Sequence, residues 1–180
     1  HSYPVCWRHK KPIFFRTTPQ WFVSLHDDFK SKLLQNIDGV QWFPSWGQER
    51  MRKMIENRPD WCISRQRHWG TPLTLIYDKN TYEIHPQMQE IGQKIIKAIE
   101  ADGIEVWFNS TLEDWGVENP KENWVQSFDT LDVWFDSGSV FHLLERENLG
   151  ETADLYLEGN DQYRGWFQSS LINSIAYQNK

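Results

Sequence analysis

One stretch of the chain decides how its C-terminal part folds: Leu157-Glu158-Gly159-Asn160-Asp161-Gln162-Tyr163-Arg164-Gly165-Trp166-Phe167. The apolar run just before it predicts a strand over 155–158, and the residues that follow predict a helix over 163–177. In open α/β sheets, polar groups that bind ligands lie where a strand ends and a helix begins. We therefore expect Glu158, Asp161 and Gln162 to converge beside Trp166, in a site that suits a small zwitterion with an apolar side chain. These residues alone leave one alternative open, a solvated turn before a helix.

The length and composition are those of a globular chain. It has 180 residues, 39% hydrophobic and 24% charged, which suffices for one domain with a core or for two small ones. No apolar run reaches the ~18 residues of a membrane span, and the first 20 residues lack the apolar core of a signal peptide. Because only two cysteines occur, Cys6 and Cys62, we expect no disulfide framework and a reducing, cytoplasmic compartment.

Charged and aromatic residues are distributed unevenly along the chain. Residues 1–70 carry 12 Lys/Arg and 6 Asp/Glu, a net charge of +6, whereas residues 71–180 carry 7 and 19, a net charge of −12. The basic half indicates a face for a polyanion; the alternative is that the two halves pack against each other. The chain also has 11 Trp, and we expect most of them to be core residues rather than aromatic surface for a ligand or partner.

Hydrophobic periodicity predicts a mixture of helices and short strands. Helices are expected over 27–37, 45–57 and from Pro86 to about 102, each with one apolar face. Asp27 or Asp28 is predicted to cap the first helix, and Ser45 with Gln48 resembles a capping box for the second. Short strands are expected in the following ranges, of which the third and fourth form a hairpin: 13–15, 21–23, 73–77, 82–84, 104–108 and 133–135.

Two motifs lie in the basic half. Cys6 and His9 form a Cys-x-x-His pair, which can supply two of the four ligands of a structural zinc site. A second motif, Trp61-Cys62-Ile63-Ser64-Arg65-Gln66-Arg67-His68-Trp69-Gly70, places two arginines between tryptophans. Arginine forks bind phosphate and aromatic rings stack on bases, so an RNA contact is one interpretation, and arginines that join two structural layers are the other. The residues proposed for that contact are Arg65, Gln66, Arg67 and Trp69.

A third motif, Asp132-Val133-Trp134-Phe135-Asp136-Ser137-Gly138-Ser139, holds two carboxylates around an aromatic run. Paired carboxylates beside tryptophan are typical of glycoside hydrolases. On a strand, however, Asp132 and Asp136 would lie about 13 Å apart at about 3.3 Å per residue, too far for either glycosidase geometry. A structural loop is therefore the preferred interpretation over a carbohydrate enzyme.

The three motifs, in the order 61–70, 132–139 and 157–167, closely resemble those of the class I isoleucyl-tRNA synthetases. Valyl and leucyl enzymes share a version of the first motif, whereas the third is isoleucyl in form. The resemblance implies an α/β fold, with an α+β connective-peptide core and a partial Rossmann strand and helix at the C-terminal end. It also implies that residues 1–25 are return strands from the editing insertion, residues 26–150 the connective-peptide core, and residues 151–180 the start of the second half of the Rossmann catalytic domain.

The resemblance also implies a function for a longer parent protein. Such a parent activates L-isoleucine with ATP and Mg to form isoleucyl-AMP and transfers the isoleucyl group to tRNA(Ile). Carried over residue by residue, Glu158, Gly159, Asp161 and Gln162 would line the aminoacyl-adenylate site, and Trp166 would contact the isoleucine side chain. No residue of the chain itself is expected to be catalytic.

The resemblance also bears on what the chain can do alone. The HIGH and KMSKS motifs, which bind ATP in this family, do not occur in these 180 residues, so we expect an inactive, excised piece of a monomeric, cytoplasmic enzyme. Cys6 and His9 match half of a zinc knuckle, although family knuckles often use four cysteines. The departure at His9 leaves zinc binding by the parent open, and no zinc is expected in this chain alone. The alternative function is a stand-alone RNA-binding module that uses the basic N-terminal half.

Overall fold

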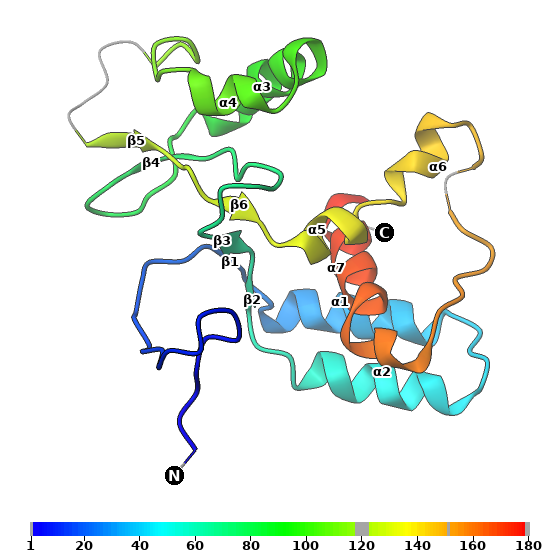
Figure 1. Cartoon of the computed structure of the whole chain (residues 1–180). Coiled ribbons are helices and arrows are strands. Elements are labelled where there is room, and N and C mark those ends of the chain that lie inside the picture. The colour runs from blue at the N-terminus through cyan, green and yellow to red at the C-terminus, as the bar shows by residue number, and fades with distance from the viewer. Residues whose placement is uncertain (1, 118–122, 151, 179–180) are drawn as a thin grey trace.

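The structure is a computed structural model that describes residues 2–117, 123–150 and 152–178. Helices α1, α2 and α7 gather on one side of the molecule, and α3 and α4 lie on the other (Figure 1). Short strands connect the two sides, with β1, β2, β3 and β6 in the middle. The mixed α and β character expected from the sequence is confirmed.

The first core lies among α1 (Asp27–Asp38), α2 (Trp46–Glu56) and α7 (Trp166–Gln178). Each helix contributes apolar residues at the spacing that puts them on one face, which is why they bury together. The bounds of α1 and α2 agree with those predicted to within one residue, whereas α7 begins three residues later than predicted. The fully buried members of this core are Leu33, Ile37, Met51, Ile55 and Ile172.

The second core lies among α3 (Met88–Asp102), α4 (Glu105–Asn109) and a two-stranded sheet of β4 (Ile76–Asp78) and β5 (Trp124–Gln126). The ring of Trp107 is fully buried there and stacks on Trp115 at 5.7 Å. Its indole Nε1 donates a hydrogen bond to the Ser127 carbonyl at 2.9 Å. The two cores share no buried residue.

The strands are short and pair antiparallel. β1 (Phe22–Val23) pairs with β2 (Trp61–Cys62), and β3 (Ser64–Arg65) pairs with β6 (Thr130–Leu131). The predicted hairpin over 73–84 is reduced to a single bridge between Tyr77 and Ile84, and β5 takes the rest of the pairing with β4. Within the described ranges no strands pair in parallel, so these residues form no Rossmann sheet among themselves.

Three predicted strands are wrong, in addition to the one over 155–158 that is described below. Residues 104–108 form α4, because a helix buries Trp107 against the second core and this packing overrides the β propensity of the sequence. Residues 133–135 begin α5 (Val133–Gly138), whose N-cap is Asp132. Residues 13–15 take no regular structure, and the rings of Phe14 and Phe15 are exposed.

Two predictions of helix capping are also wrong. His26 occupies the N-cap of α1, and its Nδ1 accepts a hydrogen bond from the Phe29 amide at 3.3 Å, so neither Asp27 nor Asp28 caps this helix. Ser45 stands at the N-cap of α2, as predicted, but it has helical dihedrals and makes no side-chain cap bond. Gln48 donates to Asp38 at 3.0 Å, so the predicted capping box is absent.

The segment before α7 contains the motif that opened the sequence analysis. After α6 (His142–Arg146), residues 155–158 are extended but pair with no strand in the described parts of the chain, so the predicted strand is absent. Leu155 and Leu157 are 74% and 78% exposed. The backbone then winds into the 3-10 helix η1 (Asn160–Arg164), and α7 follows within two residues.

Candidate functional site

The turn at η1 presents a row of hydrogen-bond acceptors. The Glu158 carboxylate accepts from the Gly159 amide at 3.1 Å, and the Asp161 carboxylate accepts from Gln162 Nε2 at 3.0 Å. Gln162 Oε1 accepts from the Trp166 amide at 2.9 Å and so caps the first turn of α7. Both carboxylates are exposed and keep free acceptor positions, so they can bind an ammonium group or a hydroxyl.

Trp166 stands beside these acceptors on the first turn of α7. Its indole Nε1 donates to the Ser137 carbonyl of α5 at 2.8 Å. One face of the ring stacks on Tyr156, with centroids 4.1 Å apart and planes 24° apart. The half-buried indole is therefore fixed on an edge and on one face, which gives an apolar wall of defined orientation.

Tyr156 supports this wall from the extended segment. Its hydroxyl forms a hydrogen bond with Ser170 of α7 at 2.7 Å. Burial raises the pKa of Tyr156 above its ordinary value, and the Ser170 hydrogen bond opposes the shift. We did not predict either Tyr156 or the Ser137 carbonyl as part of the site, because a stacking partner and a backbone acceptor leave no motif in the sequence.

Helix α5 lies close against α7 through two glycines. A Cβ added at Gly138 would lie 2.7 Å from the Ser169 carbonyl carbon, and one added at Gly165 would lie 3.0 Å from the Trp134 ring. Asn173 of α7 also donates to the Phe135 carbonyl at 2.9 Å. The motif at 132–139 thus forms the platform on which the start of α7 rests.

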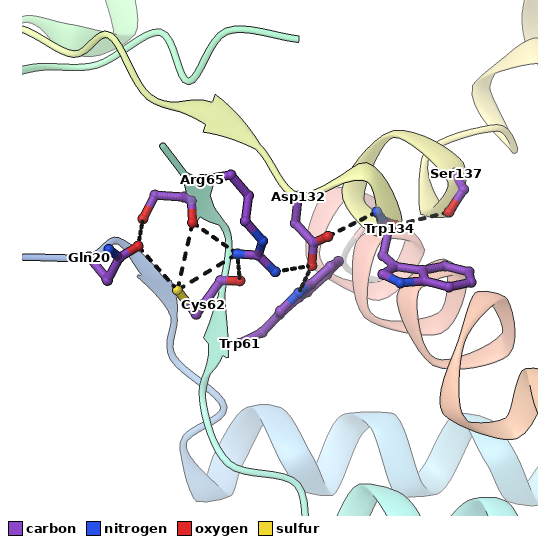
Figure 2. Close-up of polar contacts among 8 residues, drawn as sticks. Gln20, Trp61, Cys62, Arg65, Asp132, Trp134 and Ser137 are labelled. Atoms are coloured by element: carbon purple, nitrogen blue, oxygen red, sulfur yellow. Dashed lines mark hydrogen bonds and ion pairs between the residues drawn. The ribbon is translucent and has the colours of Figure 1, made fainter. Parts of the chain in front are cut away.

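Asp132 joins this platform to the central strands (Figure 2). Its buried carboxylate accepts from Trp61 Nε1 at 2.9 Å and pairs with Arg65 Nη2 at 2.9 Å. Its other oxygen accepts from the Trp134 amide at 3.3 Å and caps α5. The motifs at 61–70 and 132–139, 71 residues apart between Trp61 and Asp132, therefore meet in one hydrogen-bonded cluster.

The four residues proposed for an RNA or interdomain contact divide into two pairs. Arg65 is bound internally to Asp132 and to the carbonyls of Cys62 and Ser64, as expected of an arginine that joins layers. Gln66 donates to Asp129 at 3.2 Å.

Arg67 and Trp69, the second pair, point to solvent, and the Trp69 side chain is 87% exposed. Gln66 is exposed as well, but its amide bonds Gln20 and Asp129, so of the four only Arg67 and Trp69 have side chains without a hydrogen bond in the described structure.

The second carboxylate of the motif, Asp136, lies in α5 rather than on a strand. Its partial burial raises the pKa of the carboxyl above 3.8, a hydrogen bond with Thr71 opposes this shift, and the charge of Asp132 reinforces it. The distance argument made for a strand does not apply to a helical Asp136. Asp132 is nevertheless bound to three donors, so it is not available as a general acid or base.

Cys6 and His9 lie together in an N-terminal turn. The Cys6 Sγ and His9 Nδ1 atoms are 3.3 Å apart, and the His9 amide donates to the same sulfur at 3.5 Å. Two ligands at that spacing could grip one edge of a zinc ion. Among the residues that the structure describes, no group of three or more His, Cys, Asp or Glu side chains could complete such a site.

Two further properties concern the described chain as a whole. A half-open cleft of about 210 Å³ is lined by Pro19, Gln20, Trp21 and Tyr82 and shares no residue with the η1 turn, so it has no part in this site. No helix in the described ranges is long and apolar enough to cross a membrane.

Three curated relatives are isoleucine–tRNA ligases. The one from Photorhabdus laumondii subsp. laumondii is 52% identical over 184 residues, which cover 100% of this chain and 20% of the relative. The one from Vibrio parahaemolyticus is 54% identical over 181 residues, with 98% and 19% covered. The one from Pasteurella multocida is 49% identical over 185 residues, with 100% and 20% covered. The chain spans about a fifth of the length of these relatives.

A family model gives the same assignment. The model of the family described as tRNA synthetases class I (I, L, M and V) matches residues 8–180. These matches give no support to the alternative of a stand-alone RNA-binding module. The match runs through the Trp61–Gly70, Asp132–Ser139 and Leu157–Phe167 motifs that build the platform and the turn, and the chain therefore belongs to the class I tRNA synthetases of the I, L, M and V group.

Proposed function

We propose that this chain is a segment of an isoleucine–tRNA ligase, which activates L-isoleucine with ATP and transfers the isoleucyl group to tRNA(Ile). The observation that carries the proposal is the similarity of nearly the whole chain to isoleucine–tRNA ligases at about 50% identity. In this proposal the enzyme is cytoplasmic and monomeric. Residues 1–25 return from the editing insertion, residues 26–150 form the connective-peptide core, and residues 151–180 re-enter the Rossmann domain.

In the proposed site, Glu158, Gly159, Asp161 and Gln162 line the isoleucyl-adenylate. The exposed carboxylates of Glu158 and Asp161 suit the ammonium group of the amino acid and the ribose hydroxyls, because both present hydrogen-bond donors. Trp166 contacts the isoleucine side chain with the ring face that Tyr156 leaves open. An indole ring that is fixed at its edge discriminates between side chains by size better than an indole ring that rotates freely.

ATP and Mg belong to the proposed reaction, but the described residues hold little of their site. When bound, Mg neutralises phosphate charge during adenylate formation. The HIGH and KMSKS motifs do not occur in these 180 residues, so the phosphate end of ATP would be bound by other parts of the enzyme. Likewise, Cys6 and His9 supply two of the four ligands that a structural zinc needs, so a complete zinc site would require two further ligands from the longer protein.

Arg67 and Trp69 are the proposed contact with tRNA or with a neighbouring domain. Their exposure and their position in the basic half support this role. A contact of this kind would use arginine charge and an aromatic ring, the two groups that bind phosphate and stack on bases.

The direct test is isoleucine-dependent pyrophosphate exchange by a full-length enzyme that contains this chain. We expect exchange with isoleucine to exceed exchange with leucine or methionine, and Glu158→Ala or Gln162→Ala to abolish most of it. Trp166→Ala should raise the KM for isoleucine and leave the KM for ATP unchanged. Near-normal exchange by the first two variants, or an unchanged isoleucine KM in the third, would rule out the proposed roles. The 180-residue chain alone should give no exchange.

A further inference from the structure

The turn that carries Asp161 and Gln162 is attached to helix α2 by one arginine. Arg50 Nη1 donates to Asn160 Oδ1 at 2.6 Å, across 110 residues of sequence. The same guanidinium lies 5.0 Å above the centre of the Tyr163 ring. Arg50 therefore binds the first residue of η1 through a charged hydrogen bond and the fourth through its aromatic face.

The Tyr163 side chain is itself enclosed by α2 and by Trp42, which precedes that helix. Its ring is buried and stacks at 6.1 Å on Trp42. A Cβ added at Gly47 would come within 2.1 Å of the Tyr163 hydroxyl, so only glycine allows α2 to approach so closely. Arg50 thus acts on a residue that already has one fixed position.

A second arginine beyond the end of α2 reaches the same turn from the other side. Arg58 donates to Gln168 of α7, and Gln168 Nε2 donates to the Tyr163 carbonyl. Burial lowers the pKa of Arg58. η1 is consequently held at its first residue through the Asn160 side chain, and at its fourth through the ring and the carbonyl of Tyr163.

We propose that Arg50 is a positioning residue that holds η1, and with it Asp161 and Gln162, in the geometry that binds isoleucyl-adenylate; this rests on the function proposed above. Arg50 touches no reacting atom. Asp161 is exposed and Gln162 is half-buried, so packing against other side chains does little to fix their positions. Without the Arg50–Asn160 bond, the turn spends less time in the binding geometry, and the apparent affinity falls by that fraction.

The test is isoleucine-dependent pyrophosphate exchange in the full-length enzyme. We expect Arg50→Ala to lower kcat/KM for isoleucine roughly tenfold, equivalent to about 1.4 kcal/mol. Arg50→Lys should recover part of the loss, because it restores a cation that can bind Asn160. The double variant of Arg50→Ala and Asn160→Ala should be no worse than Arg50→Ala alone, since both remove the same bond.

Arg52→Ala is the matched control. Arg52 lies on the same helix but pairs with Asp38 at 2.7 Å and Glu56 at 3.7 Å, away from the turn. We expect Arg52→Ala to keep wild-type kcat/KM, and thermal unfolding to show that both alanine variants remain folded at the assay temperature.

Equal kcat/KM for Arg50→Ala and Arg52→Ala would overturn the proposal, as would additive losses in the double variant. If pyrophosphate exchange by the wild-type enzyme does not depend on added isoleucine, the proposed function is refuted instead.

Discussion

The close approach of α5 to α7 predicts a measurable cost for one added methyl group. In Gly138→Ala, the new Cβ would lie 2.7 Å from the Ser169 carbonyl carbon and oxygen, where ordinary contacts begin at 3.4 Å. The two helices must therefore separate by about 0.7 Å, because the obstructing atoms belong to rigid backbone. Such overpacking costs about 1–3 kcal/mol, and alanine returns about 0.5–1 kcal/mol of helix propensity. We expect a net loss of about 1–2 kcal/mol.

The assay is urea unfolding of the chain, followed by tryptophan fluorescence. Gly92→Ala provides the control, because Gly92 lies in α3 and its added Cβ meets nothing within 4 Å. That variant should gain up to about 1 kcal/mol. Each variant is compared with the wild type, and if Gly138→Ala is no less stable than the wild type, the reasoning about the α5–α7 contact is wrong. Ser137 precedes Gly138, and its carbonyl accepts the hydrogen bond that orients Trp166. The displacement should therefore also raise the KM of the full-length enzyme for isoleucine.

Two further predictions concern carboxylates of the same platform. Asp132→Ala leaves the Trp61 and Arg65 donors without their acceptor and should cost about 2 kcal/mol, reduced by water access to the partly exposed Arg65; a change below about 0.5 kcal/mol in urea unfolding would contradict this. For Asp136, the raised pKa means that folding favours the protonated form, so its contribution to stability is full below pH 3.8 and is lost as the pH rises through the folded pKa. Asp136→Asn should therefore be more stable than the wild type at pH 7, with a difference that shrinks as the pH falls towards 3.8; an unfolding difference independent of pH would refute the cause.

Long amphipathic helices could be predicted from the sequence because their signal is local. The faces of α1, α2 and α3 repeat at helical spacing, and their bounds agree with prediction to within a few residues. Short aromatic runs could not be assigned in this way. Residues 104–108 and 133–135 have strand composition, but burial of Trp107 and the cap from Asp132 make them helical. For the second run a signal was available, since aspartate just before an apolar run is a typical N-cap.

The residues that line the candidate site could be named from the sequence, but the residues that hold them in place could not. Glu158, Asp161, Gln162 and Trp166 do lie on one turn and its following helix. The contacts that hold them come from Arg50, which belongs to none of the three motifs, and from the backbone carbonyl of Ser137, whose role the 132–139 motif does not reveal. Such pairings follow from how the helices pack, and a single sequence does not record that packing.

The two separate cores have a consequence for how the molecule opens. Because they share no buried residue, each can unfold as its own cooperative unit. The η1 turn and α7 belong with the first core through Tyr163 and Ile172. We therefore expect amide hydrogen exchange to divide the chain into two groups of protected residues, one from α1, α2 and α7 and the other from α3 and β4. A partial opening of the second group would leave the turn folded.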